Sequence, residues 1–513
     1  MAMSAQSPLL VDHQQQQLTL LERYAQTRAL SDRLAAPLSA EDAMVQSMPD
    51  ASPSKWHLAH TTWFFERFVL QADPQYVVFD PAWDFLFNSY YQSVGPMHAR
   101  ARRGVLSRPS LQQVRDYRAA VDAQMQRRLR DGLLDEATCT IVQLGIQHEQ
   151  QHQELLLTDI KHALWSNPLQ PAYREAQPVP AAASSALRWH ARDEQIVEIG
   201  AASWPQAEAF AYDNESPRHR VLVGAHALAH RVVSNSEYQQ FIDDGGYRSA
   251  GAWLSDGWAM VQAQGWQHPL YWDADGREFT LEGWRVRDAH APVCHLSLFE
   301  ADAFARWAGA RLPTEAEWEQ AATGIAVHGN FVDSDALHPR AADAVDTGLQ
   351  QLFGDVWEWT GSAYLPYPGF APWPGSLGEY NGKFMNAQWV LRGGSCATPA
   401  SHVRASRERR RPRHPTRACR ADRPAPAAGR HHRRCPGRPV ADAQDAAVDI
   451  FLRCARLAVV RSDHSPARVL PHHHRTEPAR GQHELDRAGD RRGRARGGVR
   501  QWQRPQDRVA AAR

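Results

Sequence analysis

The sequence has no long apolar run and little cysteine. Among its 513 residues, no stretch approaches the roughly 20 apolar residues that a membrane-spanning helix needs. Polar, glutamine-rich residues 12–17 stand where a signal peptide would carry its apolar core. The six cysteines are scattered, without a C-x-x-C pair. These absences exclude an integral membrane protein and a disulfide-stapled scaffold, so we expect a reduced, cytoplasmic protein with no membrane partner.

The last fifth of the chain lacks lysine, tyrosine, asparagine and methionine. Residues 407–513 contain 27 arginines and 11 acidic residues, with Phe451 and Trp502 as the only aromatic side chains besides histidine. Their net charge of +16 offsets −15 in residues 1–406, so the overall charge of +1 hides the asymmetry. Low apolar content and high charge predict a disordered, arginine-rich tail.

The length predicts about two to four domains. Residues 10–165 have helical apolar periodicity. Ser52 and Pro53 provide a capping residue and a first-turn proline for the second helix. The periodic segments predict a four-helix bundle; they are 18–34, Pro53–Leu70, Val114–Leu129 and Ile141–Leu164.

A change in amino-acid composition and residue pattern after residue 165 marks a second domain. Residues 166–191 are rich in proline and alanine and are typical of a linker. Residues 192–406 have short strand-like segments with many tryptophans and glycines, which indicates mixed α and β structure. One helix is predicted at Leu298–Trp307, and Thr314 with Glu317 forms the pattern of a capping box for the next.

Three histidines suggest a metal site. His148 and His152 are four residues apart in H-E-Q-Q-H and therefore share one face of the predicted fourth helix. A third ligand must come from another element, where His60 and His57 compete within one helical turn. Three imidazoles leave coordination positions open, as a catalytic metal requires. An isolated H-x-x-x-H is commonly a coincidence, so the inference that these histidines bind a metal ion depends on further motifs in the sequence.

The connection Phe87–Gly104 is long for a helical bundle, and long ordered loops often carry function. It contains Tyr90 and Tyr91 side by side, followed by a basic cluster that includes Arg100 and Arg103. The arginines are either a solvated charge run or guanidinium forks for a substrate carboxylate.

Specific motifs extend these inferences. Three stretches of the second domain resemble the formylglycine-generating-enzyme (sulfatase-modifying-factor) domain, which has an irregular α+β fold related to C-type lectins. They are P-V-C-H-L-S-L-F-E through R-L-P-T-E-A-E-W-E, G-D-V-W-E-W-T-G-S and V-L-R-G-G-S. W-H-L-A-H-T-T-W-F-F-E with H-E-Q-Q-H-Q-E-L-L resembles the DinB-like metal-binding four-helix bundle. Together, across about residues 10–406, they resemble the ergothioneine-biosynthesis sulfoxide synthases. The implied fold is multidomain, α and α+β.

That resemblance implies a non-haem iron(II) enzyme. Its members use dioxygen to join the thiol of cysteine or γ-glutamylcysteine to C2 of the imidazole of hercynine (Nα-trimethylhistidine), with the sulfur emerging as a sulfoxide. The iron ligands carried over from the motifs are His60, His148 and His152, because the family's ligand is the histidine of L-A-H rather than His57.

The resemblance also implies roles around the iron. Gln151 matches the residue that hydrogen-bonds the hercynine imidazole, and Arg100 and Arg103 match the arginines that hold the carboxylate of the thiol substrate. Tyr90 and Tyr91 match a branch of the family with tyrosines near the iron, which makes them candidate proton or electron donors.

Two other activities are alternatives for a chain with these motifs. A formylglycine-generating-type cysteine oxidase needs a cysteine pair after the R-G-G-S strand, but Cys396 has no companion before Cys419. A DinB-type metal-dependent thiol transferase would leave the second domain unexplained.

The family pattern breaks after Ser406, where an aromatic, asparagine-containing segment and a final strand are expected. An evolved tail that binds nucleic acid is one interpretation, but no known binding fold is visible and we expect no specific nucleic-acid partner. We favour an out-of-frame translation of residues 407–513. One possible coding of Ile450–His464, shifted by one base, resembles the start of the histidine methyltransferase that makes hercynine. We therefore expect no packed core in this tail, an unpaired sheet edge and an incomplete hercynine pocket.

Overall fold

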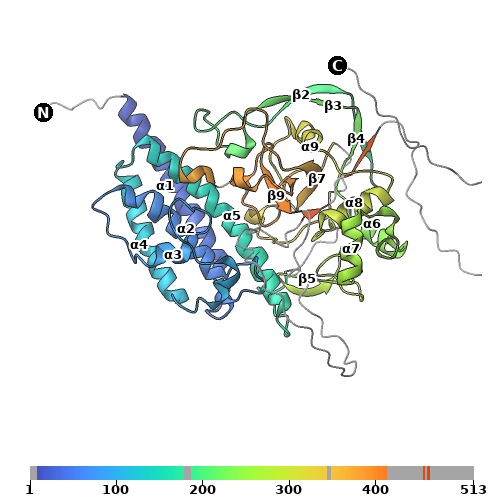
Figure 1. The fold of residues 1–513 in the computed structure, drawn as a ribbon, viewed down its shortest axis with the longest axis horizontal. Helices are drawn as coiled ribbons and strands as arrows, with labels where there is room; N and C mark the ends of the chain where they lie inside the picture. The colour runs from blue at the N-terminus through green and yellow to red at the C-terminus, as the bar shows by residue number, and fades with distance from the viewer. Residues whose placement is uncertain are drawn as a thin grey trace, which may run out of the picture. The chain divides into compact units, whose positions relative to one another are not determined.

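Two bodies of different secondary structure make up the described part of the chain, one helical and one mixed (Figure 1). The structure, a computed structural model, describes residues 8–177, 186–343, 348–379, 381–412, 455–456 and 459–462. Both bodies belong to one compact unit.

The helical body is the predicted bundle. Its long helices are α1 (Pro8–Ala35), α2 (Ser54–Phe68), α4 (Leu111–Arg130) and α5 (Glu136–Ser166), and the short α3 (Trp83–Phe87) lies between α2 and α4. Ser110 caps α4 with a capping box, and the Asp135 side chain caps α5. The four long helices predicted from periodicity are therefore confirmed.

The predicted cap of α2 is wrong. Pro53 occupies the N-cap position and no side chain caps the helix. Ser52 is used elsewhere: its hydroxyl accepts a hydrogen bond from Arg103 Nη1 at 2.8 Å, and its backbone N–H donates to Asp159 Oδ2 at 2.9 Å. Both partners are buried, and a buried charge without partners is costly, so they hold Ser52 outside the helix.

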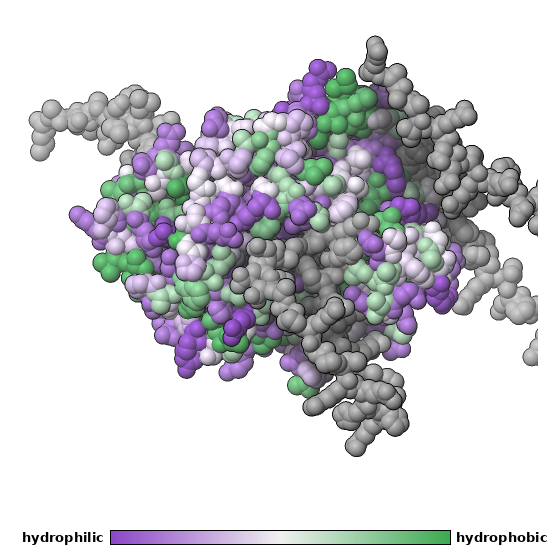
Figure 2. All heavy atoms as spheres, in the orientation of Figure 1, coloured by the Kyte–Doolittle hydropathy of each residue, from purple (hydrophilic) through white to green (hydrophobic). Residues whose placement is uncertain are grey.

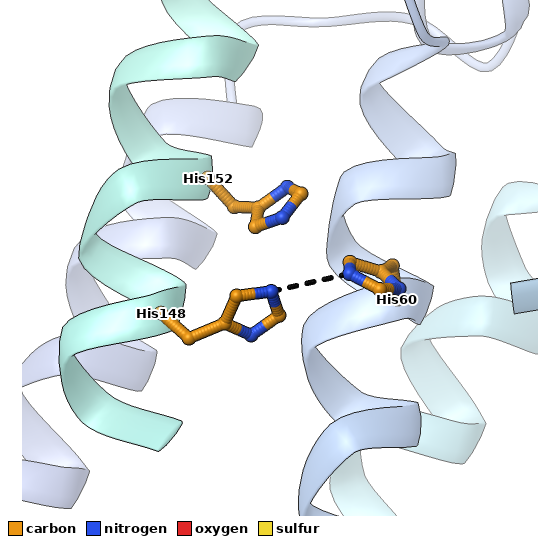
Figure 3. A group of neighbouring side chains, drawn as sticks. All are labelled: His60, His148 and His152. Atoms are coloured by element: carbon orange, nitrogen blue, oxygen red, sulfur yellow. Dashed lines mark hydrogen bonds between the residues drawn. The ribbon is translucent and has the colours of Figure 1, made fainter. Parts of the chain in front are cut away.

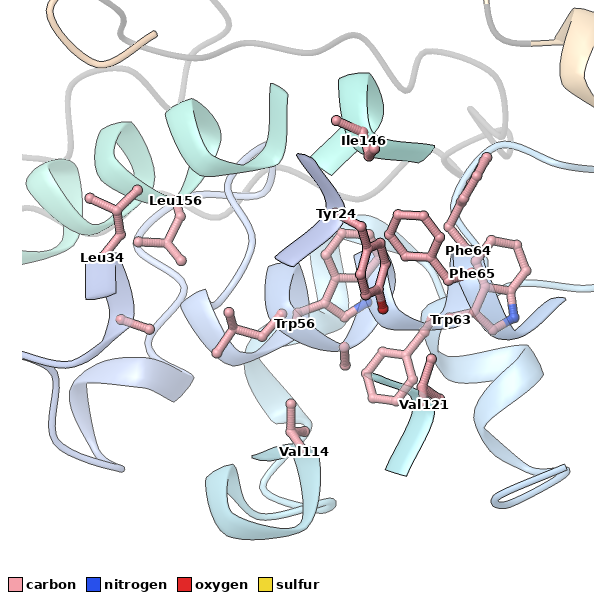
Figure 4. Packing of buried hydrophobic residues seen from close by; sticks show 14 of the residues in the cluster. Tyr24, Leu34, Trp56, Trp63, Phe64, Phe65, Val114, Val121, Ile146 and Leu156 are labelled. Carbon is pink, nitrogen blue, oxygen red and sulfur yellow. The ribbon is translucent and has the colours of Figure 1, made fainter. Parts of the chain in front are cut away.

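Aromatic packing around α2 fills the bundle. Figure 4 shows side chains of all four long helices meeting there, and the ring centroids of Tyr24 and Phe65 lie 4.9 Å apart in an edge-on contact. Almost the whole of α2 is buried because it packs against both α4 and α5. A helix enclosed on so many sides can place polar side chains such as histidine in a dry interior.

The second body contains short strands and four helices among its described residues. The helices are α6 (Asn235–Asp243), α7 (Ser255–Gln264), α8 (Leu298–Trp307) and α9 (Glu315–Ala322). The prediction for α8 is confirmed, and Thr314 forms the expected capping box with Glu317 at the start of α9. Tryptophans and phenylalanines supply the largest side chains of the core around α8.

The strands form two small sheets and two hairpins. The first sheet has the order β1-β4-β11, from β1 (Trp189–Arg192), β4 (His226–Ala229) and β11 (Val460–Ser462). The second has the order β10-β7-β8-β9, from β10 (Ala455–Arg456), β7 (Trp357–Ala363), β8 (Gln388–Arg392) and β9 (Glu408–Pro412). The hairpins pair β2 (Gln195–Ile199) with β3 (His219–Val223) and β5 (Arg277–Thr280) with β6 (Gly283–Val286).

The predicted linker is partly structured. The Tyr173 hydroxyl donates to the carbonyl of Leu34 on α1 at 2.6 Å, while its backbone N–H donates to the carbonyl of Leu281 in the second body at 2.8 Å. Strand β1 also begins at Trp189, inside the range predicted as linker. Residues 178–185 lie outside the described residues. The segment directly after α5 thus fastens the bundle to the second body.

Three short pieces of the predicted tail form strands. β9 pairs antiparallel with β8, β10 pairs parallel with β7, and β11 pairs antiparallel with β4. Val459 and Val460 are buried. The expectation of an unpaired sheet edge is therefore wrong at β8, where β9 supplies the pairing, and at β4, where β11 supplies it. The predicted disorder elsewhere in the tail falls outside the described residues.

We expect Val460→Asp to destabilise the protein by about 3 kcal/mol or more, because it buries a carboxylate without a partner. Val460 is fully buried, packs with Leu228 and Ala321, and exchanges backbone hydrogen bonds of 2.7 and 2.9 Å with Arg311. Thermal unfolding checks this against Val286→Asp, since Val286 is 81% exposed. Equal melting temperatures for the two variants would contradict the pairing of β11 with β4.

Within the described residues, no helix is long and apolar enough to cross a membrane. The face drawn in Figure 2 mixes hydrophilic side chains with scattered hydrophobic ones over its coloured surface.

Candidate metal centre

His60, His148 and His152 come together between α2 and α5, as Figure 3 shows. One ring nitrogen from each lies within 4.8 Å of the others, and Nε2 of His60 is 3.2 Å from Nε2 of His148. All three side chains are buried. The structure thus brings together the three residues predicted as metal ligands.

The neighbouring rings fix these imidazoles in place. The His60 ring stacks on Trp56 with centroids 4.6 Å apart and lies 5.7 Å from the nearly parallel ring of Trp63. His148 packs against Phe64 at 4.9 Å. Because these aromatic residues belong to α2 itself, the motif W-H-L-A-H-T-T-W-F-F supplies both His60 and the rings that hold it in place.

A hydrogen bond to the His60 ring determines which of its two nitrogens keeps a lone pair. Nδ1 of His60 lies 2.6 Å from the carbonyl oxygen of Phe87, the last residue of α3. A carbonyl only accepts, so Nδ1 carries the proton and Nε2 keeps its lone pair toward His148. This is the arrangement of a metal-ligating histidine whose other nitrogen is held by an outer partner.

Burial keeps the imidazoles neutral. It lowers the pKa of His148 to about 4 against a smaller opposing effect of Glu149. Burial, then the neighbouring histidines, also hold the pKa of His60 and of His152 well below the usual range. Neutral imidazole is the form that binds metal ions, so the cluster is prepared to accept a cation at neutral pH.

His57 contacts the cluster from outside. Its Nδ1 is 2.9 Å from Nδ1 of His152, and its Nε2 is 3.0 Å from Oδ2 of Asp159. Burial raises the pKa of Asp159 to about 6, against the opposing effect of the bond from His57. Of the two candidates for the third position, His60 belongs to the three-histidine group found among the described residues, and His57 does not.

Of the two predicted arginines, Arg103 lies beside this cluster. The guanidinium carbon of Arg103 lies 3.4 Å from the centroid of the Trp56 ring, and the His60 ring also stacks on Trp56. Its charge contributes to the lowered pKa of His60. Arg100 lies over the Tyr90 ring, with its guanidinium carbon 5.3 Å from the ring centroid. Arg103 is buried, so the interpretation of these arginines as a solvated charge run does not fit it.

The two predicted tyrosines have different surroundings. Tyr91 is buried in the aromatic core, 5.1 Å from Phe68 and 5.8 Å from Trp63, which lies between it and His60. Tyr90 faces the second body, where its ring meets Phe384 edge-on at 5.5 Å. The structure therefore places Tyr91 within a packed core and Tyr90 at the contact between the two bodies.

The face of α5 that carries Gln151 turns toward the second body. The Gln151 side chain is buried one residue before His152. On neighbouring turns, Gln147 Oε1 lies 2.8 Å from His402 Nδ1, and Glu154 accepts hydrogen bonds from Trp357 Nε1 at 2.8 Å and Thr398 Oγ1 at 3.0 Å. These contacts hold the second body against the helix that carries two of the three histidines.

One arginine of the predicted tail contacts the same helix. Arg409 Nη1 forms an ion pair of 2.7 Å with Glu154, and the guanidinium carbon lies 5.5 Å from the centroid of the Trp357 ring. Arg407 lies over Tyr212 and donates from Nε to His402 Nε2 at 3.3 Å. Guanidinium groups thus stand where the family resemblance implied an aromatic, asparagine-containing segment.

Sequence reasoning missed Asp159 and the contact of His57 with His152. A signal for both was present, because Asp159 follows His152 by seven residues and His57 precedes His60 by three, so each pair shares a helix face. The contacts of Gln147 and Glu154 with the second body had no such local signal, since they join positions more than 200 residues apart.

The described cysteines do not form the pair that a copper-dependent cysteine oxidase needs. Cys139, Cys294 and Cys396 are all buried and none is in a disulfide. Cys419 lies outside the described residues.

Comparison with known proteins identifies both bodies. Residues 23–156 match the DinB superfamily, and residues 181–347 and 342–420 match the Sulfatase-modifying factor enzyme 1-like domain. The formylglycine-generating enzyme of Mycobacterium tuberculosis is 26% identical over 235 residues, which cover 34% of this chain and 75% of that protein. That match covers about a third of this chain.

Hercynine oxygenases match both bodies. The chain is 33% identical over 393 residues to the hercynine oxygenase of Mycolicibacterium thermoresistibile, covering 70% of this chain and 83% of that protein. It is 35% identical over 408 residues to the hercynine oxygenase of Mycobacterium tuberculosis, covering 74% and 92%. With its bundle, its second domain and its three convergent histidines, this chain belongs to the hercynine oxygenase family.

Proposed function

We propose that the protein is an iron(II)-dependent sulfoxide synthase of ergothioneine biosynthesis. The substrates are hercynine, dioxygen and a thiol, either cysteine or γ-glutamylcysteine. The observation that carries the proposal is the group of three buried, neutral imidazoles, His60, His148 and His152, in a chain of the hercynine oxygenase family.

The donor set fits an iron(II) ion. Imidazole nitrogen suits iron among other divalent metals, and three protein ligands leave positions for substrates. When bound, the ion supplies the redox chemistry for oxygen-dependent formation of the C–S bond. The chain's own residues then have to bind and orient the two organic substrates.

Substrate binding falls to groups around the histidines. Arg103 presents a buried guanidinium beside Trp56 and His60, which suits the carboxylate of the thiol substrate, with Arg100 as its companion. Gln151 offers an amide to the hercynine imidazole from the same helix as His148 and His152. Holding both substrates at one place converts a multi-body encounter into a local reaction.

Proton supply is assigned to the tyrosines of the loop before Arg100. A phenol can donate a proton when charge develops on oxygen. Tyr90 is the better placed of the two, because it faces the second body while Tyr91 is packed among Trp63 and Phe68.

Product analysis tests the proposal. Iron(II)-loaded protein incubated in air with hercynine and cysteine, or hercynine and γ-glutamylcysteine, is expected to yield a hercynine–thiol conjugate with one added oxygen, detected by mass spectrometry. The preferred thiol is identified by the faster conversion. A conjugate that forms equally fast without protein, or no conjugate with either thiol while iron is bound, would refute the assignment.

A further inference from the structure

We propose that His57 is a positioning residue that fixes the tautomer and orientation of His152 through a relay anchored on Asp159. The inference rests on the proposed metal site and concerns two residues that no substrate role requires. Its basis is a continuous row of short contacts, from the backbone of Ser52 through Asp159 and His57 to His152.

The anchor of the relay is Asp159. Oδ2 of Asp159 accepts a hydrogen bond from the backbone N–H of Ser52 at 2.9 Å, and the same oxygen lies 3.0 Å from Nε2 of His57. The Ser52 hydroxyl is held in turn by Arg103 at 2.8 Å. Since the carboxylate oxygen accepts both bonds, the proton of the His57 bond resides on Nε2 of His57.

The proton positions follow along the relay. With Nε2 of His57 protonated, its Nδ1 has a lone pair and accepts from Nδ1–H of His152 across 2.9 Å. Nε2 is then the ring nitrogen of His152 that keeps a lone pair. The carbonyl of Phe87 produces the same result at His60, where Nδ1 is the protonated nitrogen. Two ligands on different helices are thus held in the same tautomer by different acceptors.

The relay also has the rigidity that positioning requires. His57 and Asp159 are almost completely buried, and the His57 ring is flanked by Trp56 and His152, with centroids 5.8 and 5.2 Å away. His57 lies on α2 and Asp159 on α5, so the relay fixes the separation of the two helices that supply the ligands. Outer partners of this kind typically change metal affinity about 10–100-fold when they are removed.

The test measures binding of Co²⁺ as a spectroscopic probe of the three-histidine site, by anaerobic titration and competition with a chelator. His57→Phe keeps the ring but removes both hydrogen bonds, and we expect its Co²⁺ affinity to fall about 10–100-fold with an altered visible spectrum. His57→Asn should recover part of the loss, because its Oδ1 can replace Nδ1 as the acceptor for His152. Asp159→Asn should weaken binding about tenfold, because its amide can also donate and so reverse the relay.

His162→Phe is the matched control. His162 is equally buried on α5, but its Nδ1 contacts Ser47 Oγ at 2.7 Å instead of a ligand histidine, so affinity should not change. Should His57→Phe fail to fold, Asp159→Asn carries the test. Wild-type affinity in a folded His57→Phe or in Asp159→Asn would overturn the positioning role alone. Absence of Co²⁺ and Fe²⁺ binding by the unmodified protein would instead overturn the metal site on which the proposed function depends.

Discussion

Replacing His148 by alanine is expected to abolish metal binding and, with it, oxygen consumption. His148 Nε2 lies 3.2 Å from Nε2 of His60, and His152 is four residues away on the same helix face. Two imidazoles cannot enclose a cation as three do, so the loss should exceed the ~100-fold that outer partners cause. Iron content after anaerobic reconstitution and gel filtration provides the measurement.

The control for this change is His162→Ala, which removes a buried histidine from the same helix. It should retain iron in the same ratio as the unmodified protein. Circular dichroism of both variants without metal shows whether α5 is intact. Equal iron content in His148→Ala and His162→Ala would contradict the assignment of His148 as a ligand.

Replacing Glu149 by glutamine is expected to cause a large loss of stability. Glu149 is fully buried, and its carboxylate pairs with Arg28 at 2.9 Å and Arg118 at 3.0 Å while accepting from Ser31 at 2.6 Å. Removing its charge takes away the carboxylate that the two buried guanidinium groups share, and leaves Arg28 paired with Asp122 alone and Arg118 with Asp32 alone. Breaking a buried ion pair in this way costs about 3–5 kcal/mol. Denaturant unfolding of the metal-free protein measures the change.

Glu198→Gln is the corresponding change in an exposed ion pair. Glu198 and Arg218 are each 57% exposed and 3.0 Å apart, so the loss should stay below about 1 kcal/mol. A Glu149→Gln variant as stable as Glu198→Gln would show that the Arg28–Glu149–Arg118 network contributes little to the bundle.

The bundle was predictable from the sequence because its signals are local. Apolar periodicity located all four long helices, and the spacing of His148 and His152 placed both on one face. The choice of His60 over His57 came from the family resemblance rather than from spacing. The structure gives that choice a physical reason, because the carbonyl of Phe87 and the stacked Trp56 orient His60 toward His148.

The contacts between the two bodies were not predictable from local patterns. Glu154 meets Trp357 and Thr398, and Gln147 meets His402, through side chains far apart in the sequence. The prediction of Ser52 as the cap of α2 failed for a related reason. Ser52 has the chemistry of a cap, but long-range partners, Arg103 and Asp159, take its polar groups.

The predicted tail is paired with the second domain where strand β11 lies. Val460 pairs with Leu228 of β4 and is buried, so this piece of the segment joins the second domain. The out-of-frame origin of residues 407–513 stays a prediction. Sequencing of the genomic locus tests it, and one verified, uninterrupted frame through codon 407 would refute it.

Oxygen uptake by the anaerobically iron(II)-loaded protein tests the central claim most directly. We predict uptake that requires hercynine and a thiol together and that disappears in His148→Ala. Its rate is expected to be low, because Arg407 and Arg409 stand where the family resemblance implied part of the hercynine pocket. Uptake that proceeds without hercynine, or that persists in His148→Ala, would contradict the assignment of the three histidines as the centre of a hercynine oxygenase.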